Sequence, residues 1–330
     1  MLIKIKCIDE DKPGEKWGKV FKRTWPYYRA WYLQEGYTAR PGYLSCKEAL
    51  DEYMPELSEL YEEICEIAGG RDLTSRYLSM WNPPAFMSGC TQVAWTKNRH
   101  ALIRNYDYNP KWFEGVMLKS NWLQPVMGIS DCNWGLLDGI NGSGLCASLN
   151  FGGRNVVGQG FGIPLVIRFL LETCENVGDA IKALKRIPVH MAYNVMLMDR
   201  DGEYVTVYLG PDRKPALITK RACTNHQEDI DWIEYARQTQ TIERERAAEG
   251  FLKDKNMDLV SICRKFLQPP LHQFDLKKSF ATLYSAAWFP ETGEAELFWK
   301  GKKLNQSFEE FNEHKITVQI TKQVESFISL

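Results

Sequence analysis

The chain has 330 residues, of which 44% are hydrophobic and 25% are charged, with 41 basic and 42 acidic side chains. This length supports one large domain or two modest ones without covalent cross-links. The balanced charge provides no general attraction for a polyanion, so nucleic acid is not expected as a partner. The most apolar segment, 163–172, is short and contains Arg168, so no interaction with a membrane through a spanning helix is expected.

The nine cysteines form neither a CxxC pair nor a Cys/His cluster with the spacing of a zinc site. No metal ion or other cofactor is therefore expected. The first residues lack the apolar run of a signal peptide. Together these features predict a cytoplasmic protein whose thiols are reduced and lie mostly in the core.

The first ninety residues are expected to be mainly helical. Residues 2–7 alternate between apolar and basic side chains, which is typical of a short strand. Residues 45–70 carry an apolar stripe with helical spacing, and Pro55 can divide this helix into two pieces. A second short helix is expected over 73–81, directly before a proline pair.

From Cys90 onward the pattern changes to paired strands separated by helices, which makes this cysteine the best candidate for a domain boundary. The expected hairpins lie at 90–108, 135–151, 192–210 and 281–300, the helices at 163–187, 228–248 and 256–267, and a late strand at 315–324. Groups of hairpins with intervening helices favour an α+β layered domain over a parallel, doubly wound sheet.

Cys90 follows Ser88-Gly89 at this boundary, and a thiol at such a point is a candidate nucleophile. A cysteine reacts as the thiolate and needs a base within reach. One candidate base is a histidine, of which His226 is an example. The other is the cysteine's own α-amino group, whose pKa of about 8 suits proton transfer at neutral pH. That second solution requires cleavage of the chain before Cys90.

Four motifs occur in one order along the chain: "GCTQ" at 89–92, "RNYDY" at 104–108, "DGINGSGLCASLNFGG" at 138–153 and "TNHQ" at 224–227. In this order they resemble the cysteine N-terminal-nucleophile (Ntn) hydrolases, which include penicillin V acylase, bile-salt hydrolase and acid ceramidase. The resemblance is greatest to the self-processing acyl-coenzyme A:6-aminopenicillanic acid acyltransferase-like family (peptidase family C45).

This resemblance implies a four-layer αββα sandwich, in which two antiparallel sheets are stacked between helix layers. It also implies an N-terminal pro-segment, 1–89, and a catalytic domain, 90–330. The implied activity is hydrolysis or transfer at linear C–N amide bonds, after self-cleavage of the precursor. The expected partners are small N-acyl amides or acyl-CoA, and a homo-oligomer is compatible with the sequence.

Four residues around the boundary take roles from the resemblance. Cys90 is the nucleophile that attacks the carbonyl of Gly89, whose lack of a Cβ lets the thiol approach. Asp107 is expected to hold the new α-ammonium group, and Arg104 to lower the pKa of the thiol. Because side chains alternate along a strand, a bend between Arg104 and Asp107 is expected to bring both to Cys90.

Further residues are expected to complete the site. The resemblance implies that Asn150 and Asn225 donate hydrogen bonds to the oxyanion of the tetrahedral intermediate. Thr224 and His226 are candidate substrate-binding residues beside Asn225.

Ser285 stands in "TLYSAAW", where bile-salt hydrolases carry a late arginine, and is a weaker candidate for substrate binding. The absence of that arginine argues against bile salts as substrates. Two alternatives stay open: an uncut thiol enzyme with a Cys90–His226 dyad, and a catalytically silent binding protein with the same fold.

Overall fold

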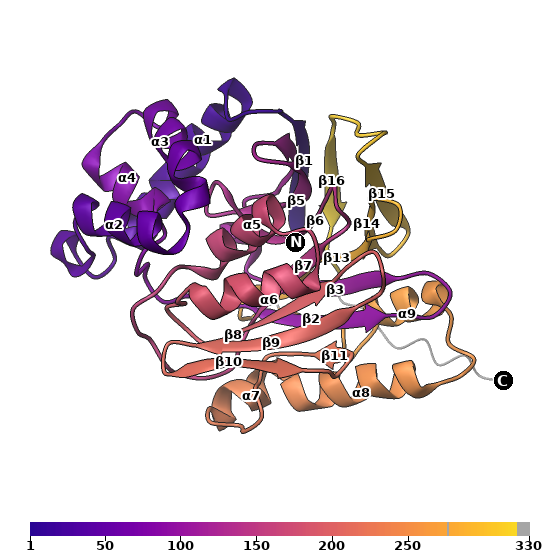
Figure 1. The fold of residues 1–330 in the computed structure, drawn as a ribbon. Coiled ribbons are helices and arrows are strands. Elements are labelled where there is room, and N and C mark those ends of the chain that lie inside the picture. The colour runs from indigo at the N-terminus through magenta and orange to yellow at the C-terminus, as the bar shows by residue number, and fades with distance from the viewer. Residues whose placement is uncertain (276, 322–330) are drawn as a thin grey trace.

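The computed structural model of the chain describes residues 1–275 and 277–321. Strands and helices alternate in the order shown in Figure 1, and two antiparallel-rich sheets form the centre of the molecule. The nine-stranded sheet has the order β10-β9-β8-β7-β6-β5-β4-β1-β16, and the second sheet has the order β11-β2-β3-β13-β14-β15, with β12 pairing to β13.

The strands of the nine-stranded sheet come from both ends of the chain. They are β1 (Leu2–Asp9), β4 (Val116–Asn121), β5 (Pro125–Asp131), β6 (Gly135–Asn141), β7 (Cys146–Phe151), β8 (Tyr193–Met198), β9 (Tyr204–Gly210), β10 (Arg213–Ile218) and β16 (Lys315–Gln319). Helices α5 (Ile163–Thr173) and α6 (Val177–Arg186) cover its outer face. Helix α5 packs mainly on β6, and α6 packs on β8, β9 and β10.

The second sheet carries the hairpin that starts at the candidate nucleophile. Its strands are β2 (Gly89–Trp95), β3 (Ala101–Tyr108), β11 (Ala222–Cys223), β12 (Phe274–Asp275), β13 (Phe280–Phe289), β14 (Glu294–Trp299) and β15 (Lys302–Ser307). Helices α7 (Ile233–Thr239), α8 (Thr241–Lys253) and α9 (Leu259–Phe266) follow β11, and α8 and α9 pack on β2 and β3. The result is the expected helix–sheet–sheet–helix sandwich.

The first part of the chain is mainly helical, as expected, and gathers at one side of the sandwich (Figure 1). Its elements after β1 are α1 (Glu15–Tyr32), α2 (Tyr43–Tyr53), α3 (Ser58–Ile67) and α4 (Asp72–Leu78), with short 3-10 turns at Tyr37–Ala39 and Pro55–Leu57. A third 3-10 turn, Pro110–Trp112, follows β3. Pro55 does divide the helix expected over 45–70.

Several other sequence expectations are confirmed with shifted limits. The helix expected at 228–248 is divided into α7 and α8 by Gln240, which has a left-handed backbone with φ of 50°. The late strand covers 315–319, and residues 322–324 of the expected range lie outside the described residues. Helix α1 was not predicted, although its 18 residues bury Trp17, Val20 and Phe21 on one face.

β1 ties the N-terminal segment into the sandwich. It pairs parallel to β4 and antiparallel to β16, so it completes the sheet between two strands that lie far apart in the sequence. Ile3, Ile5 and Cys7 point into the main core, whereas the intervening lysines are exposed. This alternation is that of a strand buried on one face.

We predict that Ile5→Ala lowers the free energy of unfolding by about 2–5 kcal/mol, because it removes buried methyl groups and leaves a cavity. Lys6→Ala, the next residue on the exposed face of β1, is the matched control and is expected to change it by less than about 0.5 kcal/mol. Urea unfolding of the two variants measures both values. Equal losses would show that β1 is not packed as described.

Candidate active site

Cys90 is the second residue of β2 and is completely buried. Its side chain points toward the nine-stranded sheet, the same direction as its neighbour Gln92, which donates a hydrogen bond to Ser148 on β7 at 2.8 Å. The Sγ atom lies 3.1 Å from Nη2 of Arg104 and 3.8 Å from the hydroxyl of Ser88. The thiol therefore meets a guanidinium group inside the protein.

Arg104 is held in place by groups other than the thiol. Its Nη1 donates to the carbonyl of Leu137 at 2.6 Å and to Oδ2 of Asp138 at 2.8 Å, and Tyr284 donates to that same oxygen at 2.8 Å. A buried guanidinium needs such a paired carboxylate to offset its lost hydration. From the sequence alone, neither Asp138 nor Tyr284 was assigned a role, although Asp138 begins the motif at 138–153 and Tyr284 stands next to Ser285.

Opposing effects act on the pKa of Cys90. Burial raises it above its ordinary value, the positive charge of Arg104 lowers it, and the negative charge of Asp107 raises it again. Burial prevails, so the thiol is protonated in the uncut chain near neutral pH. A thiol in this state needs a base to accept its proton before it can react.

Asp107 reaches the site from the other face of the sheet. Strand β3 is continuous from Ala101 to Tyr108, and Asp107 pairs with Gly89 while Arg104 pairs with Gln92. The bend expected between Arg104 and Asp107 is therefore absent, and that expectation was wrong. No bend is needed, because Arg104 approaches the thiol on one face and Asp107 approaches the backbone of Gly89 on the other.

The carboxylate of Asp107 is surrounded by donors. Oδ1 accepts a hydrogen bond from the hydroxyl of Thr282 at 2.6 Å, and Oδ2 lies 3.5 Å from Nη1 of Arg244. Burial raises the pKa of Asp107, while Arg244 and then Thr282 lower it. Arg244 and Thr282 therefore favour the charged form of the Asp107 carboxylate, whereas its burial favours the neutral form.

Gly89 cannot be replaced without displacing its surroundings. A Cβ atom at this position would lie 2.7 Å from Cζ of Phe280 and 3.1 Å from Cβ of Asp107. Both contacts are closer than carbon atoms approach without overlap. The absence of a side chain at Gly89 thus lets the β2 backbone lie directly against the Asp107 side chain. Glycine is required here for this close approach as well as for its backbone flexibility.

Asn225 holds the peptide on both sides of Gly89. Its Oδ1 accepts from the backbone N–H of Cys90 at 2.7 Å, and its Nδ2 donates to the carbonyls of Ser88 at 3.2 Å and Phe151 at 3.0 Å. The hydroxyl of Tyr235 donates to the same Ser88 carbonyl at 2.8 Å. The amide of Asn225 is therefore fully occupied by the uncut chain.

Arg244 is a second buried arginine at this point, and the sequence did not reveal it. From α8 it donates to the carbonyl of Cys90 at 2.6 Å, to the hydroxyl of Thr91 at 2.9 Å and to Oδ1 of Asn225 at 2.8 Å. It stands in "TIERERAAEG", which has the composition of an exposed, charged helix. Only the packing of α8 on β2 brings it to Cys90.

Asn150 lies beside the site but not against the thiol. Its Nδ2 is 3.3 Å from each of the carbonyls of Cys223 and Thr224, and its buried Oδ1 has no hydrogen-bond partner among the described residues. The side chain thus supports the backbone that carries Asn225. Thr224 has a similar place, because its hydroxyl bonds to the carbonyl and hydroxyl of Thr241 on α8.

His226 faces away from the thiol. Its Nδ1 lies 3.0 Å from the hydroxyl of Thr241 and 3.2 Å from that of Thr224, and its Nε2 lies 3.2 Å from Oε2 of Glu245. Both ring nitrogens are therefore engaged on the α8 side of Asn225. This arrangement disfavours the Cys90–His226 dyad.

Ser285 lies on the opposite face of the sheet from the Cys90 thiol. It pairs with Asn105, to which its hydroxyl donates at 2.6 Å, whereas Cys90 pairs with Tyr106, the next residue of β3. Asn105 in turn donates to the carbonyls of Phe266 and Leu271 on the α9 side. The geometry therefore does not bring Ser285 to the thiol, and of the candidate residues on β3 it shares a face with Asp107 rather than with Arg104.

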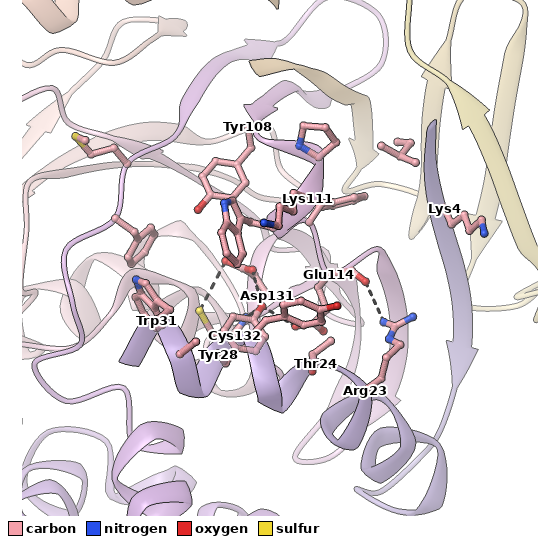
Figure 2. Close-up of a pocket in the computed structure, with 18 of the residues that line it drawn as sticks. Lys4, Arg23, Thr24, Tyr28, Trp31, Tyr108, Lys111, Glu114, Asp131 and Cys132 are labelled. Atoms are coloured by element: carbon pink, nitrogen blue, oxygen red, sulfur yellow. Dashed lines mark hydrogen bonds between the residues drawn. The ribbon is translucent and has the colours of Figure 1, made fainter. Parts of the chain in front are cut away.

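A cavity of about 980 Å³ lies next to this site (Figure 2). Met87, three residues before Cys90, and Tyr108, two residues after Tyr106, are part of its lining. Asp131 lies at its wall, and burial together with the nearby Glu114 carboxylate raises the pKa of Asp131 to about 7. The rings of Tyr106 and Tyr108, 5.6 Å apart, connect the cavity with Arg104, whose guanidinium is 5.0 Å from the Tyr106 ring.

We predict that Asp131→Asn stabilises the protein relative to wild type as the pH rises from about 5 to about 8. A carboxyl whose pKa is raised on folding contributes its stability below its ordinary pKa of about 4 and loses it as the pH rises through the folded value. The difference in unfolding free energy, variant minus wild type, should grow by about 2–3 kcal/mol over this range.

The control for this experiment is Asp212→Asn. A hydrogen bond from Arg154 lowers the pKa of Asp212, so this carboxyl is ionised at pH 5 and above whether or not the chain is folded. Its difference from wild type should stay constant between the two pH values. Urea unfolding at each pH measures both variants, and a constant difference for Asp131→Asn as well would contradict a raised pKa.

Two solved structures are similar to this one. A mutant of the conjugated bile acid hydrolase from Clostridium perfringens superposes with a TM-score of 0.50 and 14% identity, over 70% of this chain and 97% of that one. Penicillin V acylase from Agrobacterium tumefaciens gives a TM-score of 0.47 and 13% identity, over 67% and 86% of the two chains. The first similarity shows the fold, which is that of the Ntn hydrolases.

The comparison with curated proteins gave no match. Among the helices of residues 1–275 and 277–321, none has the length and apolar character required to cross a bilayer. A family model does match residues 95–304, a range that begins shortly after Cys90 and contains Arg104, Asp107, Asn150 and Asn225. This match covers well over half of the sequence, and the chain therefore belongs to the acyl-coenzyme A:6-aminopenicillanic acid acyl-transferase family.

Proposed function

We propose that this protein is a self-processing cysteine amidohydrolase or acyltransferase that acts on linear C–N amide bonds of small N-acyl compounds. The observation that carries the proposal is the position of the Gly89–Cys90 peptide. Its thiol meets Arg104 at 3.1 Å, and its N–H and the following carbonyl are bound by Asn225 at 2.7 Å and Arg244 at 2.6 Å.

The first reaction is cleavage of the chain by its own thiol. Sγ of Cys90 attacks the carbonyl carbon of Gly89, the C–N bond breaks, and the thiol proton passes to the departing nitrogen. Water then hydrolyses the thioester, which leaves a carboxylate on Gly89 and a free α-amine and thiol on Cys90. Asn225 already accepts a hydrogen bond from this nitrogen in the uncut chain, so the new ammonium group can donate to the same Oδ1 atom as soon as it forms.

Asp107 supplies the charge that the ammonium group needs. It lies against Gly89 on the side opposite the thiol and is fully buried, so its interaction with a new positive charge is weakly screened. The amine can then act as the base for the thiol, because its ordinary pKa is about 8. Arg104 stabilises the thiolate that results.

The second reaction uses the same atoms on an external amide. The thiolate attacks the amide carbonyl, the amine of Cys90 delivers its proton to the leaving nitrogen, and an acyl-thioester forms. Nδ2 of Asn225 becomes available to the oxyanion once Ser88 has withdrawn. Water then gives hydrolysis and an amine gives acyl transfer, with the thiolate as leaving group in both cases.

The proposed products of self-cleavage are the segments 1–89 and 90–330. They would remain associated, because β1 contributes to the nine-stranded sheet between β4 and β16. A cytoplasmic location accords with the cysteines, all nine of which are free thiols.

Intact-mass analysis of the purified protein tests the proposal. We expect two species that separate at Gly89–Cys90 in active wild-type protein, and a single uncut, inactive species for Cys90→Ala. Thr96→Ala, one residue beyond the end of β2, is a control for local disturbance and should still be cut. An active wild-type protein that remains a single chain would favour the Cys90–His226 dyad, and uncut wild type without activity would favour a binding protein.

Asn225→Ala is predicted to lower turnover of an N-acyl substrate by about 10²- to 10³-fold, the usual effect of removing one donor to an oxyanion. The exposed Asn256 provides the matched control, and Asn256→Ala should keep wild-type turnover. Steady-state kinetics on cleaved protein measures both. Wild-type turnover in Asn225→Ala would remove this residue from the mechanism, whatever its effect on cleavage.

A further inference from the structure

The cavity beside the site is walled by aromatic side chains and closed on one side by carboxylates (Figure 2). Helix α1, the segment before Ser88, the end of β3 and the loop after it provide the aromatic residues, which are Tyr27, Tyr28, Trp31, Phe86, Tyr108, Trp112 and Phe113. Several of these rings are partly exposed, and Trp112 keeps 45% of its surface accessible. The cavity thus offers π faces to a ligand.

Two carboxyl groups meet at one tyrosine in this wall. The hydroxyl of Tyr28 lies 2.9 Å from Oε2 of Glu114 and 3.1 Å from Oδ1 of Asp131. Glu114 is 6% exposed and its oxygens also accept from Ser130 at 2.6 Å and from the N–H of Asn133 at 3.0 Å. Its hydrogen-bonding capacity is therefore used within the protein.

The carboxylate of Asp131 has fewer hydrogen-bond partners than that of Glu114. Its Oδ2 has only a 3.8 Å contact with the thiol of Cys132, and this aspartate is less buried than Glu114. No basic side chain of the described residues forms an ion pair with either carboxylate. Two neighbouring carboxylates without a cation repel each other, and burial and Glu114 together raise the pKa of Asp131 accordingly.

The basic side chains of the cavity lining are directed elsewhere. Lys4, Arg23 and Lys111 are exposed. Nη2 of Arg23 donates to the backbone carbonyl of Glu114 at 3.0 Å, and Nζ of Lys111 lies 5.0 Å above the ring of Trp112. Figure 2 shows the contact between Arg23 and Glu114 as a dashed line and Lys4 pointing away from the carboxylates. The uncompensated negative charge therefore lies inside the cavity and the positive charge at its rim.

We propose that this cavity binds a ligand with a protonated amine on an aromatic or apolar body, with the ammonium group at Asp131. An ammonium group would supply the cation that the carboxylate pair lacks, and the aromatic walls attract both the cation and the apolar body. Two residues of its lining lie close in the chain to the proposed catalytic site: Met87 is three residues before Cys90, and Tyr108 is two residues after Tyr106, which pairs with Cys90. Binding of this ligand does not depend on the proposed function; its identification as a substrate does.

The test measures binding in full-length Cys90→Ala protein, so that no reaction intervenes. 2-Phenylethylamine is titrated against its neutral isostere 2-phenylethanol and the anion 3-phenylpropionate, by calorimetry at pH 8. We expect the amine to bind at least about tenfold more tightly than the alcohol, and the anion most weakly. Equal affinities for amine and alcohol, or tighter binding of the anion, would overturn the proposal.

Variants identify the groups responsible. In the Cys90→Ala background, Asp131→Asn should remove the preference for the amine and leave binding of the alcohol unchanged. Asp229→Asn, an exposed acid outside the cavity lining, should keep the preference. Trp112→Ala should weaken amine and alcohol alike, and this exposed position tests the site even where Asp131→Asn is poorly folded. A retained preference in folded Asp131→Asn, or undiminished binding in Trp112→Ala, would count against this site.

The same data separate this inference from the proposed function. Preferential amine binding in Cys90→Ala, together with a wild-type protein that stays uncut at Gly89–Cys90, would support the cavity and refute self-processing. Equal binding of amine and alcohol in Cys90→Ala, together with a cleaved and active wild type, would refute the cavity alone.

Discussion

Two buried guanidinium groups on opposite sides of one strand are the constraint on which the rest of the structure depends. Arg104 and Arg244 have no exposed surface, yet both contact Cys90, one at its thiol and the other at its carbonyl. A buried cation without a carboxylate costs several kcal/mol. Asp138 on β6 pairs with Arg104, and Asp107 on β3 lies against Arg244. Both sheets and α8 must therefore pack correctly before Cys90 has its surroundings.

Side chains of a β-strand point alternately to its two faces, and this alternation explains why the thiol and the peptide nitrogen of Cys90 have different neighbours. Cys90 and Arg104 project between the sheets, whereas Asp107 projects toward α8. The thiol can thus be activated from one face while the peptide nitrogen is bound from the other. A single-sided arrangement would bring the carboxylate of Asp107 next to the thiol, where it would raise the thiol's pKa further.

What the sequence predicted well is local or carried by the family resemblance. Cys90, Arg104 and Asp107 belong to one hairpin with a short turn, so their proximity follows from the pairing of β2 with β3. Arg244 and Tyr235 could not be predicted, because the contact of α7 and α8 with β2 is set by packing over more than 130 residues of chain. The position of Ser285 could not be predicted for a related reason: its register in β13 decides which face of the sheet it occupies, and the sequence does not give that register.

The cavity, too, could not be predicted from the sequence. Three of its aromatic residues come from α1, a helix that the sequence pattern did not reveal, and its carboxylates come from the loop before β4 and the end of β5. Nothing in the local sequence of Glu114 or Asp131 distinguishes them from exposed acids. Their character arises only where Tyr28 bonds to both.

The segment before Gly89 connects the two regions physically. Ser88 occupies Nδ2 of Asn225 through its carbonyl, and Met87, one residue earlier, forms part of the cavity wall. A carboxylate created at Gly89 would lie beside the buried Asp107, and the repulsion between like charges in a weakly screened environment would drive this segment away. Cleavage would then free the Asn225 donor and open the wall between cavity and thiol in one movement, because the same few residues block both.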